Sequence, residues 1–214
     1  MIDIIERSSN ILKGKFMNKI AIFSLIATLA FSQAISCYAQ ENLILTNDSL
    51  GPINSSSIYD VKMLQQLFPD LTMKKKLHST EGNKFEVIVA YRNNTPLFTI
   101  VANELDHKKK ILCVSFNSNQ IKNSLGAQIG QTYASVYQHD SKPRCMPGLE
   151  EMSGLAVCQS PQSKHIFYIF MSNKAWNGPD NRLPPLDILK QSTLKQITWM
   201  PGESSAWIDQ VKCY

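Results

Sequence analysis

The feature that most constrains the fold is a pair of alternating segments joined by two asparagines. In KFEVIVAYR (residues 84–92), side chains switch between two faces with the period of two that is typical of a β-strand. One face carries Phe85, Val87, Val89 and Tyr91, and the other carries Glu86, Ile88, Ala90 and Arg92. Asn93 and Asn94 tolerate positive φ and therefore suit a tight turn. Residues 95–104 (TPLFTIVANE) return as the partner strand, so the sequence predicts a β-hairpin.

Other short segments extend this pattern along the chain. Strands are predicted at residues 43–45, 110–116, 154–160, 165–171 and 194–201. Short helices are predicted at residues 57–68, 133–137 and 183–192, the last of which begins at a pair of prolines. Many short strands with few helices favour an antiparallel arrangement. We therefore expect a mainly β, sandwich-like fold, with an α+β fold as the alternative.

The first predicted helix has recognisable signals at both ends. Ser57 and Asp60 resemble a capping box with Asp in place of Glu, and Pro69 ends the helix. Between these signals, apolar side chains recur at helical spacing, at Ile58, Val61, Leu64, Leu67 and Phe68. We expect this apolar face to pack against a sheet.

The N-terminal region has the pattern of an export signal. Lys19 supplies a short basic start, and the stretch from Ile20 to Ile35 is uncharged and largely apolar. This stretch is shorter than the roughly 20 residues that a helix needs to cross a bilayer, which indicates a removable signal. Residues 1–16 contain acidic side chains that do not fit such a signal. We therefore predict that the true start is Met17.

Two processing routes compete at the end of this signal. Residues 34–37 (AISC) approximate a lipoprotein signal, in which cleavage precedes Cys37 and acyl chains are attached to it. In the second route, an ordinary secretory cleavage follows Ala39. Tyr38 stands where an Asp would favour the inner membrane, so a lipidated chain is expected at the outer membrane.

Removal of the leader leaves enough chain for one domain with a real core. We divide the chain into an N-terminal extension plus signal peptide (1–39), a linker with a first strand (40–56) and a single envelope domain (57–214). The net charge of the whole chain is +5. This mild excess does not indicate a nucleic-acid-binding face. The runs at 74–76 and 108–110 (both KKK) are interpreted as solvated strand ends or turns, with an acidic partner or lipid head groups as the alternative.

The cysteines indicate disulfide bonds. Besides Cys37, the chain contains Cys113, Cys145, Cys158 and Cys213, and an even number in an exported chain suggests a disulfide framework. Cys145 and Cys158 are close in sequence and form the first predicted pair. A bridge from Cys113 to Cys213 would fasten the C-terminus to the core, although Cys113 also suits a free core thiol within its strand. No C-x-x-C motif supports a zinc or thioredoxin-like site.

No motif in the sequence specifies a catalytic centre. The nucleophile elbow, zinc-protease, P-loop and dinucleotide-binding patterns are all missing. The four histidines are scattered singly and are interpreted as surface or edge residues. We therefore predict no catalytic residue, no metal ligand and no cofactor.

The most distinctive stretch is WNGPDNRLPP (residues 176–185). Its prolines fix φ, and its Asn and Asp side chains favour turns. It is interpreted as a rigid loop that packs Trp176, with a preformed recognition loop as the sharper alternative. The residues of that recognition loop would be Trp176, Gly178, Pro179, Asp180 and Arg182.

Several motifs in order resemble a known family. They are EGNKFEVIV, LGAQIGQTYASVY, CMPGLEEMSGLAVC, SKHIFYIF, NGPDNRLPP and LKQITWMP. Together they resemble the sigma-E-regulated lipoprotein family, a YfeY-like bacterial envelope domain of unknown function, over most of residues 50–200. The resemblance implies a mainly β envelope protein, lipidation at Cys37 and no assigned catalytic residues. Cys113 and Cys213 are additions to the family pattern, and the residues before Cys37 match its lipoprotein signal only weakly.

These observations lead to one expected function and three alternatives. We expect a non-enzymatic exported envelope lipoprotein, periplasmic and anchored at the outer membrane. It would bind an unknown envelope partner or ligand in envelope maintenance or stress response. The first alternative is a lysozyme inhibitor with a protruding loop at 148–155 or 177–184. The second is a carrier with an apolar cavity between its sheets, and the third is an enzyme with a pocket near His139 or His165.

Overall fold

The computed structural model describes residues 43–80, 82–103, 109–138, 143–148, 152–173, 176, 178–179, 181–202 and 213, without the side chains of Thr80 and Asn83. The chain divides into a compact unit from Asn42 to Tyr214 and a separate unit from Met1 to Glu41. The predicted leader and Cys37 belong to the second of these and lie outside the described residues.

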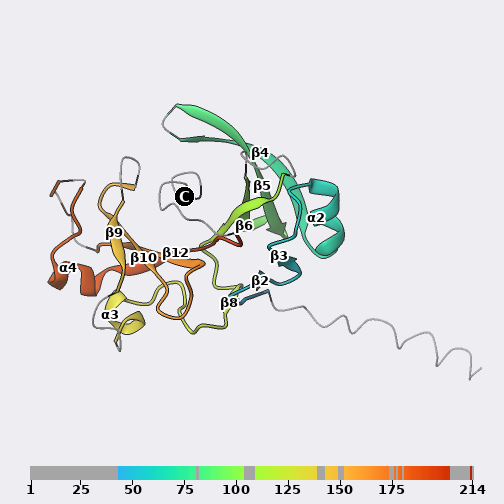
Figure 1. The fold of residues 1–214 in the computed structure, drawn as a ribbon. Helices are drawn as coiled ribbons and strands as arrows, with labels where there is room; N and C mark the ends of the chain where they lie inside the picture. Colours follow the sequence, from blue (N-terminus) through green and yellow to red (C-terminus); the bar gives the residue numbers. More distant parts are fainter. Residues whose placement is uncertain are drawn as a thin grey trace, which may run out of the picture. The chain divides into compact units, whose positions relative to one another are not determined.

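An eight-stranded antiparallel sheet forms the main part of the compact unit (Figure 1). Its order is β4-β5-β6-β7-β12-β11-β10-β9. The strands are β4 (Thr72–Thr80), β5 (Asn83–Arg92), β6 (Thr95–Ala102), β7 (Ile111–Phe116), β9 (Cys145–Pro147), β10 (Leu155–Gln159), β11 (Ile166–Met171) and β12 (Thr193–Trp199). The predicted strands at 110–116, 154–160, 165–171 and 194–201 correspond to β7, β10, β11 and β12.

A smaller four-stranded sheet and three short helices complete the described elements. The sheet consists of β1 (Ile44–Leu45), β2 (Ser49–Leu50), β3 (Ile53–Asn54) and β8 (Lys122–Asn123). The helices are α2 (Val61–Leu67), α3 (Tyr133–Val136) and α4 (Leu186–Gln191). The β1–β8 pair is parallel, and every other strand pair in the described part of the chain is antiparallel. The predicted fold class, mainly antiparallel β with a few short helices, is confirmed.

The predicted hairpin is the β5–β6 pair. Asn93 and Asn94 both have positive φ, at 50° and 63°, which is the backbone of the turn that matches the right-handed twist of two paired strands. The register around this turn shifts by a bulge between Ala90 and Tyr91. The local sequence therefore determines both the strands and the turn between them.

The eight-stranded sheet has two distinct faces. We call inner the face that shares one core with the four-stranded sheet; it carries Ile88, Ile100, Val114, Ile197 and Trp199, which pack in the same cluster as Leu45, Leu50 and Ile53. We call outer the opposite face, which carries the separate cluster of Val87, Val89, Val101 and Cys113. The predicted face assignment of residues 85–92 therefore matches the structure.

Trp199 connects the two sheets on the inner side. Its side chain is fully buried, and its indole Nε1 donates a hydrogen bond to the carbonyl oxygen of Asn47 at 3.1 Å. Asn47 lies in the turn between β1 and β2. Burial of one large apolar side chain of this kind is worth about 1.5–3 kcal/mol, so this residue contributes strongly to the packing of the small sheet on the large one.

The segment interpreted as a linker belongs to the folded unit from Leu43 onward. It contains β1, β2 and β3, and Leu45, Leu50 and Ile53 are completely buried. The predicted domain boundary at residue 57 is therefore wrong, because the folded unit begins before it. β1 corresponds to the predicted strand at residues 43–45. β2 and β3 are only two residues long, too short for an alternating pattern to appear in the sequence.

The first helix begins later than predicted. Asp60 is its N-cap, and the Asp60 carboxylate accepts hydrogen bonds from the backbone N–H groups of Lys62 and Met63. The Ser57 hydroxyl instead accepts from the backbone N–H of Asn54 at 3.0 Å. The capping role predicted for Ser57 is therefore wrong, because its side chain closes the preceding turn.

The lysine run at 74–76 lies in the middle of a strand that the sequence pattern did not reveal. Lys74, Lys75 and Lys76 pair with Val89, Ile88 and Val87 of the neighbouring β5, so their interpretation as strand ends or turns is wrong. β4 is an edge of the sheet, and lysines on an edge strand oppose pairing with other chains. In the second run, Lys108 lies outside the described residues, and Lys110 forms an isolated bridge with Ile58.

Candidate functional site

The outer face of the large sheet contains an apolar hollow of about 320 Å³. Val87, Val89 and Val101 supply aliphatic side chains to it. The other described lining residues are His78, Pro96, Leu97, Phe98, Thr99, Ser115, Phe116, Asn117, Gln196 and Cys213. This volume is at the lower end of the range for small-ligand pockets. The hollow lies on the face opposite the four-stranded sheet, and not between the two sheets, where the carrier alternative placed an apolar cavity.

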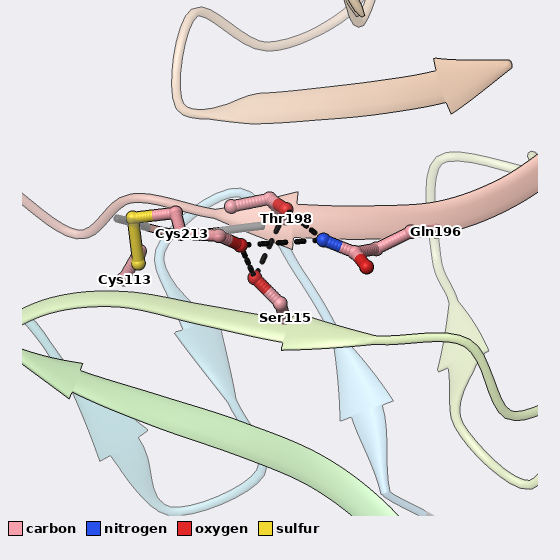
Figure 2. The surroundings of a disulfide bond; sticks show 5 residues. All are labelled: Cys113, Ser115, Gln196, Thr198 and Cys213. Atoms are coloured by element: carbon pink, nitrogen blue, oxygen red, sulfur yellow. Dashed lines mark hydrogen bonds between the residues drawn. A yellow bond between two sulfur atoms is a disulfide. The ribbon is translucent and has the colours of Figure 1, made fainter. Parts of the chain in front are cut away.

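A disulfide bond joins Cys113 of β7 to Cys213 near the end of the chain, at one side of this hollow. Figure 2 shows how polar side chains of β7 and β12 meet the backbone of Cys213. The Ser115 hydroxyl donates to the Cys213 carbonyl oxygen at 2.5 Å, and the Gln196 amide Nε2 donates to the same oxygen at 3.2 Å. The chain end is thus attached to the outer face by one covalent bond and two hydrogen bonds.

The same network satisfies a buried hydroxyl. Thr198 is completely buried, and its hydroxyl lies 3.0 Å from the Ser115 hydroxyl. The Gln196 amide also donates to the Thr198 hydroxyl at 3.3 Å. Because an unsatisfied buried hydroxyl is costly, Ser115 and Gln196 support both Thr198 and the attached Cys213.

The second disulfide is at the far edge of the sheet. Cys145 and Cys158 are directly opposite each other in the β9–β10 pair and are bonded. This bond ties the short edge strand β9 to β10. Both disulfide pairs considered from the sequence are therefore present in the structure.

Cations lie beside the hollow on the edge strand. The ammonium groups of Lys74 and Lys76 lie 5.5 Å and 5.3 Å from the centre of the Tyr91 ring, a distance typical of cation–π contacts. Lys75, which points to the opposite face, forms an ion pair with Glu86 at 2.5 Å. Within the described part of the chain, neither Lys74 nor Lys76 has an acidic partner.

Two further hollows are polar and lie elsewhere. One of about 390 Å³ is lined by Arg144, Lys164 and residues 159–163. The other, of about 330 Å³, contains Tyr168, whose hydroxyl donates to Ser160 at 3.1 Å and accepts from the amide of Asn123 at 3.2 Å. Burial raises the pKa of Tyr168, so this phenol stays protonated and serves as a structural donor.

The predicted recognition loop is only partly described, and it is separate from the hollow. Trp176 is half-buried, Gly178 lies against its ring, and Arg182 is exposed. A Cβ atom at Gly178 would overlap the Trp176 indole, so this contact requires glycine. The Arg182 N–H donates to the Pro179 carbonyl oxygen at 3.1 Å. Asp180 lies outside the described residues.

Two further sequence-based expectations concern an enzyme pocket near His139 or His165 and a protruding loop at 148–155. His139 and residues 149–151 lie outside the described part of the chain. His165 is not among the residues that line the three hollows; its backbone N–H donates to the Ser163 hydroxyl at 3.0 Å. His165 is therefore separate from the three hollows described above.

Metal-binding clusters and membrane-spanning helices are both absent from the described residues. Among these residues, no group of three or more His, Cys, Asp or Glu side chains could hold a metal ion. The helices in that part of the chain are too short or too polar to span a membrane. The outer-face hollow is therefore the feature from which a function can be argued.

The outer-face hollow was not predicted, although the sequence contains a signal for it. Residues 85–92 carry apolar side chains on both faces of one strand, and such a strand is usually covered on both sides. The opposite face of the hairpin therefore indicated a second apolar surface. The position of Cys213 against that surface depends on long-range packing, which local patterns do not reveal.

Comparisons with known proteins give a family and a related fold. Residues 30–201 match the model of a family described as protein of unknown function (DUF1131). The fold is similar to the crystal structure of the uncharacterized protein yfeY from Escherichia coli, with a TM-score of 0.56 and 18% sequence identity over 72% of this chain and 97% of that chain. No curated protein matches. Cys213 lies beyond the segment that the family model matches.

Proposed function

The chain belongs to the DUF1131 family, whose description assigns no activity, and on this premise we propose that it is a non-enzymatic, exported envelope protein that binds an apolar ligand. The ligand site is the outer-face hollow, and the role is in envelope maintenance or stress response under sigma-E control. The observation that carries the binding role is the set of valines lining a hollow of about 320 Å³, because ligand pockets are typically concave and mostly apolar.

The two disulfides support export. All four described cysteines are paired, and such bonds persist mainly in oxidising compartments such as the periplasm. In this proposal Cys37 is acylated and anchors the chain to the outer membrane. Mass spectrometry of the purified protein tests the anchor: a triacylated Cys37 is expected at the N-terminus, whereas an unmodified chain beginning at Gln40 would contradict it.

The lining of the hollow supports a non-enzymatic role. His78 is the one ionisable side chain among its described lining residues, and no carboxylate is among them. General acid–base catalysis usually needs a positioned donor and acceptor with matched pKa values. The valine side chains that line the hollow are better suited to contacting an aliphatic group than to activating a polar one.

The binding role is tested with a neutral fluorescent probe, N-phenyl-1-naphthylamine. The protein carries Cys37→Ser so that attached acyl chains do not compete. Thr99→Phe should weaken probe binding about tenfold or more, because Thr99 lines the hollow and a larger ring would fill it. Ser124→Phe is the matched control, because Ser124 is exposed and lines none of the three hollows.

Two results would contradict the proposal. Either the parent protein fails to bind the probe, or both phenylalanine variants bind it as well as the parent does. Circular dichroism and thermal unfolding of each variant establish that it is folded before its affinity is compared.

A further inference from the structure

We propose that the ligand of this hollow is a single-chain anionic amphiphile. Its aliphatic chain would contact Val87, Val89 and Val101, and its acidic head would lie on the ammonium groups of Lys74 and Lys76. This inference rests on the proposed function, because it names the chemistry of the ligand at the same site. The occupant it commits to is one acyl chain with a carboxylate or phosphate head.

The register of the edge strand β4 places two lysines next to the valines that line the hollow. Lys74 is directly opposite Val89, and Lys76 is directly opposite Val87. Directly opposite residues in an antiparallel pair have neighbouring side chains on the same face. His78 follows on the same side of β4 and lines the hollow itself. The valines that line the hollow thus have positively charged side chains beside them on the same face of the sheet.

Both ammonium groups face the same aromatic ring. Each lies within 5.5 Å of the Tyr91 ring centre. Tyr91 packs against the outer-face cluster that contains the valines of the hollow. Two positive charges near the same ring repel each other. An anion near both of them would offset that repulsion, which makes the pair complementary to an acidic head group.

Lys75, which lies between these two lysines on β4, differs from them in having an acidic partner. Lys75 points to the inner side and is neutralised by Glu86 at 2.5 Å. Within the described residues, Lys74 and Lys76 are not paired with any carboxylate. Among the described residues, the carboxylate contact on β4 thus belongs to the lysine that points away from the hollow, and not to the two lysines beside it.

The size of the hollow favours one chain. Its volume of about 320 Å³ is at the low end of ligand pockets, which extend to about 1,000 Å³. A lipid with two acyl chains would need considerably more space. We therefore choose dodecanoate as the probe anion, with dodecyltrimethylammonium as the cation of equal chain length.

The first experiment measures displacement of N-phenyl-1-naphthylamine from the Cys37→Ser protein at low salt. Dodecanoate should displace the neutral probe at a concentration about fivefold or more below that required for dodecyltrimethylammonium, as two partly exposed ion pairs would allow. This preference should shrink at high salt, because exposed charges are screened.

The second experiment uses matched lysine variants. Lys74→Gln combined with Lys76→Gln should weaken dodecanoate binding about fivefold and leave binding of the neutral probe unchanged. Lys75→Gln, on the same strand but the opposite face, should leave both affinities unchanged. All three positions are exposed, so these variants are expected to fold.

The outcomes separate this inference from the proposed function. If the neutral probe does not bind, the proposed function fails. If the neutral probe binds but dodecanoate has no advantage over the cation, or if Lys75→Gln is as harmful as the double variant, the inference of an anionic ligand is wrong and the proposed apolar site stands.

Native mass spectrometry should show one dodecanoate per chain. A complex of two chains, with no retained dodecanoate, would instead make a second copy the occupant and overturn the inference.

Discussion

The two faces of the eight-stranded sheet differ in how they are covered. The inner face packs against the four-stranded sheet through completely buried side chains such as Trp199 and Leu45. The outer face has a smaller apolar cluster, a disulfide to Cys213, a polar network and a hollow. The difference indicates that the inner face mainly stabilises the fold, and that the outer face has room for a ligand.

The same strands supply both faces. In β5, Ile88 packs on the inner side while Val87 and Val89 pack on the outer side. Alternation along a strand allows one backbone to serve two surfaces with separate roles. Substitutions at neighbouring positions should therefore have different consequences, and this gives direct tests of the comparison.

The largest effect is expected for Trp199→Ala on the inner face. The substitution should lower the free energy of unfolding by about 4 kcal/mol, because it empties a buried site and removes the hydrogen bond to Asn47. Urea unfolding followed by circular dichroism measures the change. If the variant does not fold, the milder Trp199→Phe should fold with an intermediate loss. A loss below about 1 kcal/mol for Trp199→Ala would contradict the role given to the inner face.

A somewhat smaller effect is expected when the outer-face disulfide is removed. Cys113→Ala with Cys213→Ala should cost about 3 kcal/mol, because the bond closes a loop with a sequence separation of 100. The matched pair Cys145→Ala with Cys158→Ala, with a separation of 13, should cost less, since loop-closure entropy grows with loop length. Chemical denaturation compares the two, and a greater cost for the shorter loop would reverse the expected order.

The same substitution, Val to Ala, at one valine on each face compares how tightly the two faces are packed. Val114→Ala on the inner face should cost about 2 kcal/mol, because Val114 is fully surrounded by other side chains. Val101→Ala on the outer face should cost only about 1 kcal/mol, because Val101 lines the hollow and loses fewer contacts. Equal costs in urea unfolding would mean that the hollow does not loosen the packing around Val101.

The smallest effect depends on pH. Tyr59 belongs to the inner core, and its hydroxyl donates to the Glu86 carbonyl oxygen at 2.9 Å. Burial, together with a smaller effect of the Glu86 charge, raises the pKa of Tyr59 from 10.0 to about 12. Above pH 10 the unfolded chain therefore loses this proton before the folded chain does. The stabilisation is complete below pH 10 and should fall by about 1 kcal/mol by pH 11.

The variant Tyr59→Phe isolates this contribution. Its free energy of unfolding should be lower than that of the parent at neutral pH, and the difference between the two proteins should shrink between about pH 9 and 11. Urea midpoints measured at several pH values follow the difference. A difference that stays constant over this range would show that Tyr59 does not titrate differently in the folded and unfolded states.

Several parts of the fold could be predicted because local chemistry determines them. The β5–β6 hairpin follows from a period of two and from Asn93 and Asn94 at positive φ. The helix α4 begins beside its prolines, with Asp187 in its first turn and Lys190 in its last, which suits the helix dipole. The Cys145–Cys158 pair was also predicted from its short spacing, whereas the sequence left Cys113 open between a bond to Cys213 and a free thiol.

Other parts depend on long-range packing and were missed. β4 contains three consecutive lysines, so its sequence lacks an alternating pattern. β2 and β3, within residues 49–54, are too short to show one, whereas β1 corresponds to the predicted strand at residues 43–45. The attachment of Cys213 by Ser115 and Gln196 joins residues from three distant segments, and only the folded chain brings them together.

The most direct test of the outer-face site is a methyl NMR titration with dodecanoate. Signals of Val87, Val89 and Val101 should shift in a saturable way, because these side chains line the hollow. Signals of Ile100 and Val114, on the inner face, should remain in place. Equal shifts on both faces, or no shift of the three valines at saturating dodecanoate, would contradict a ligand site on the outer face.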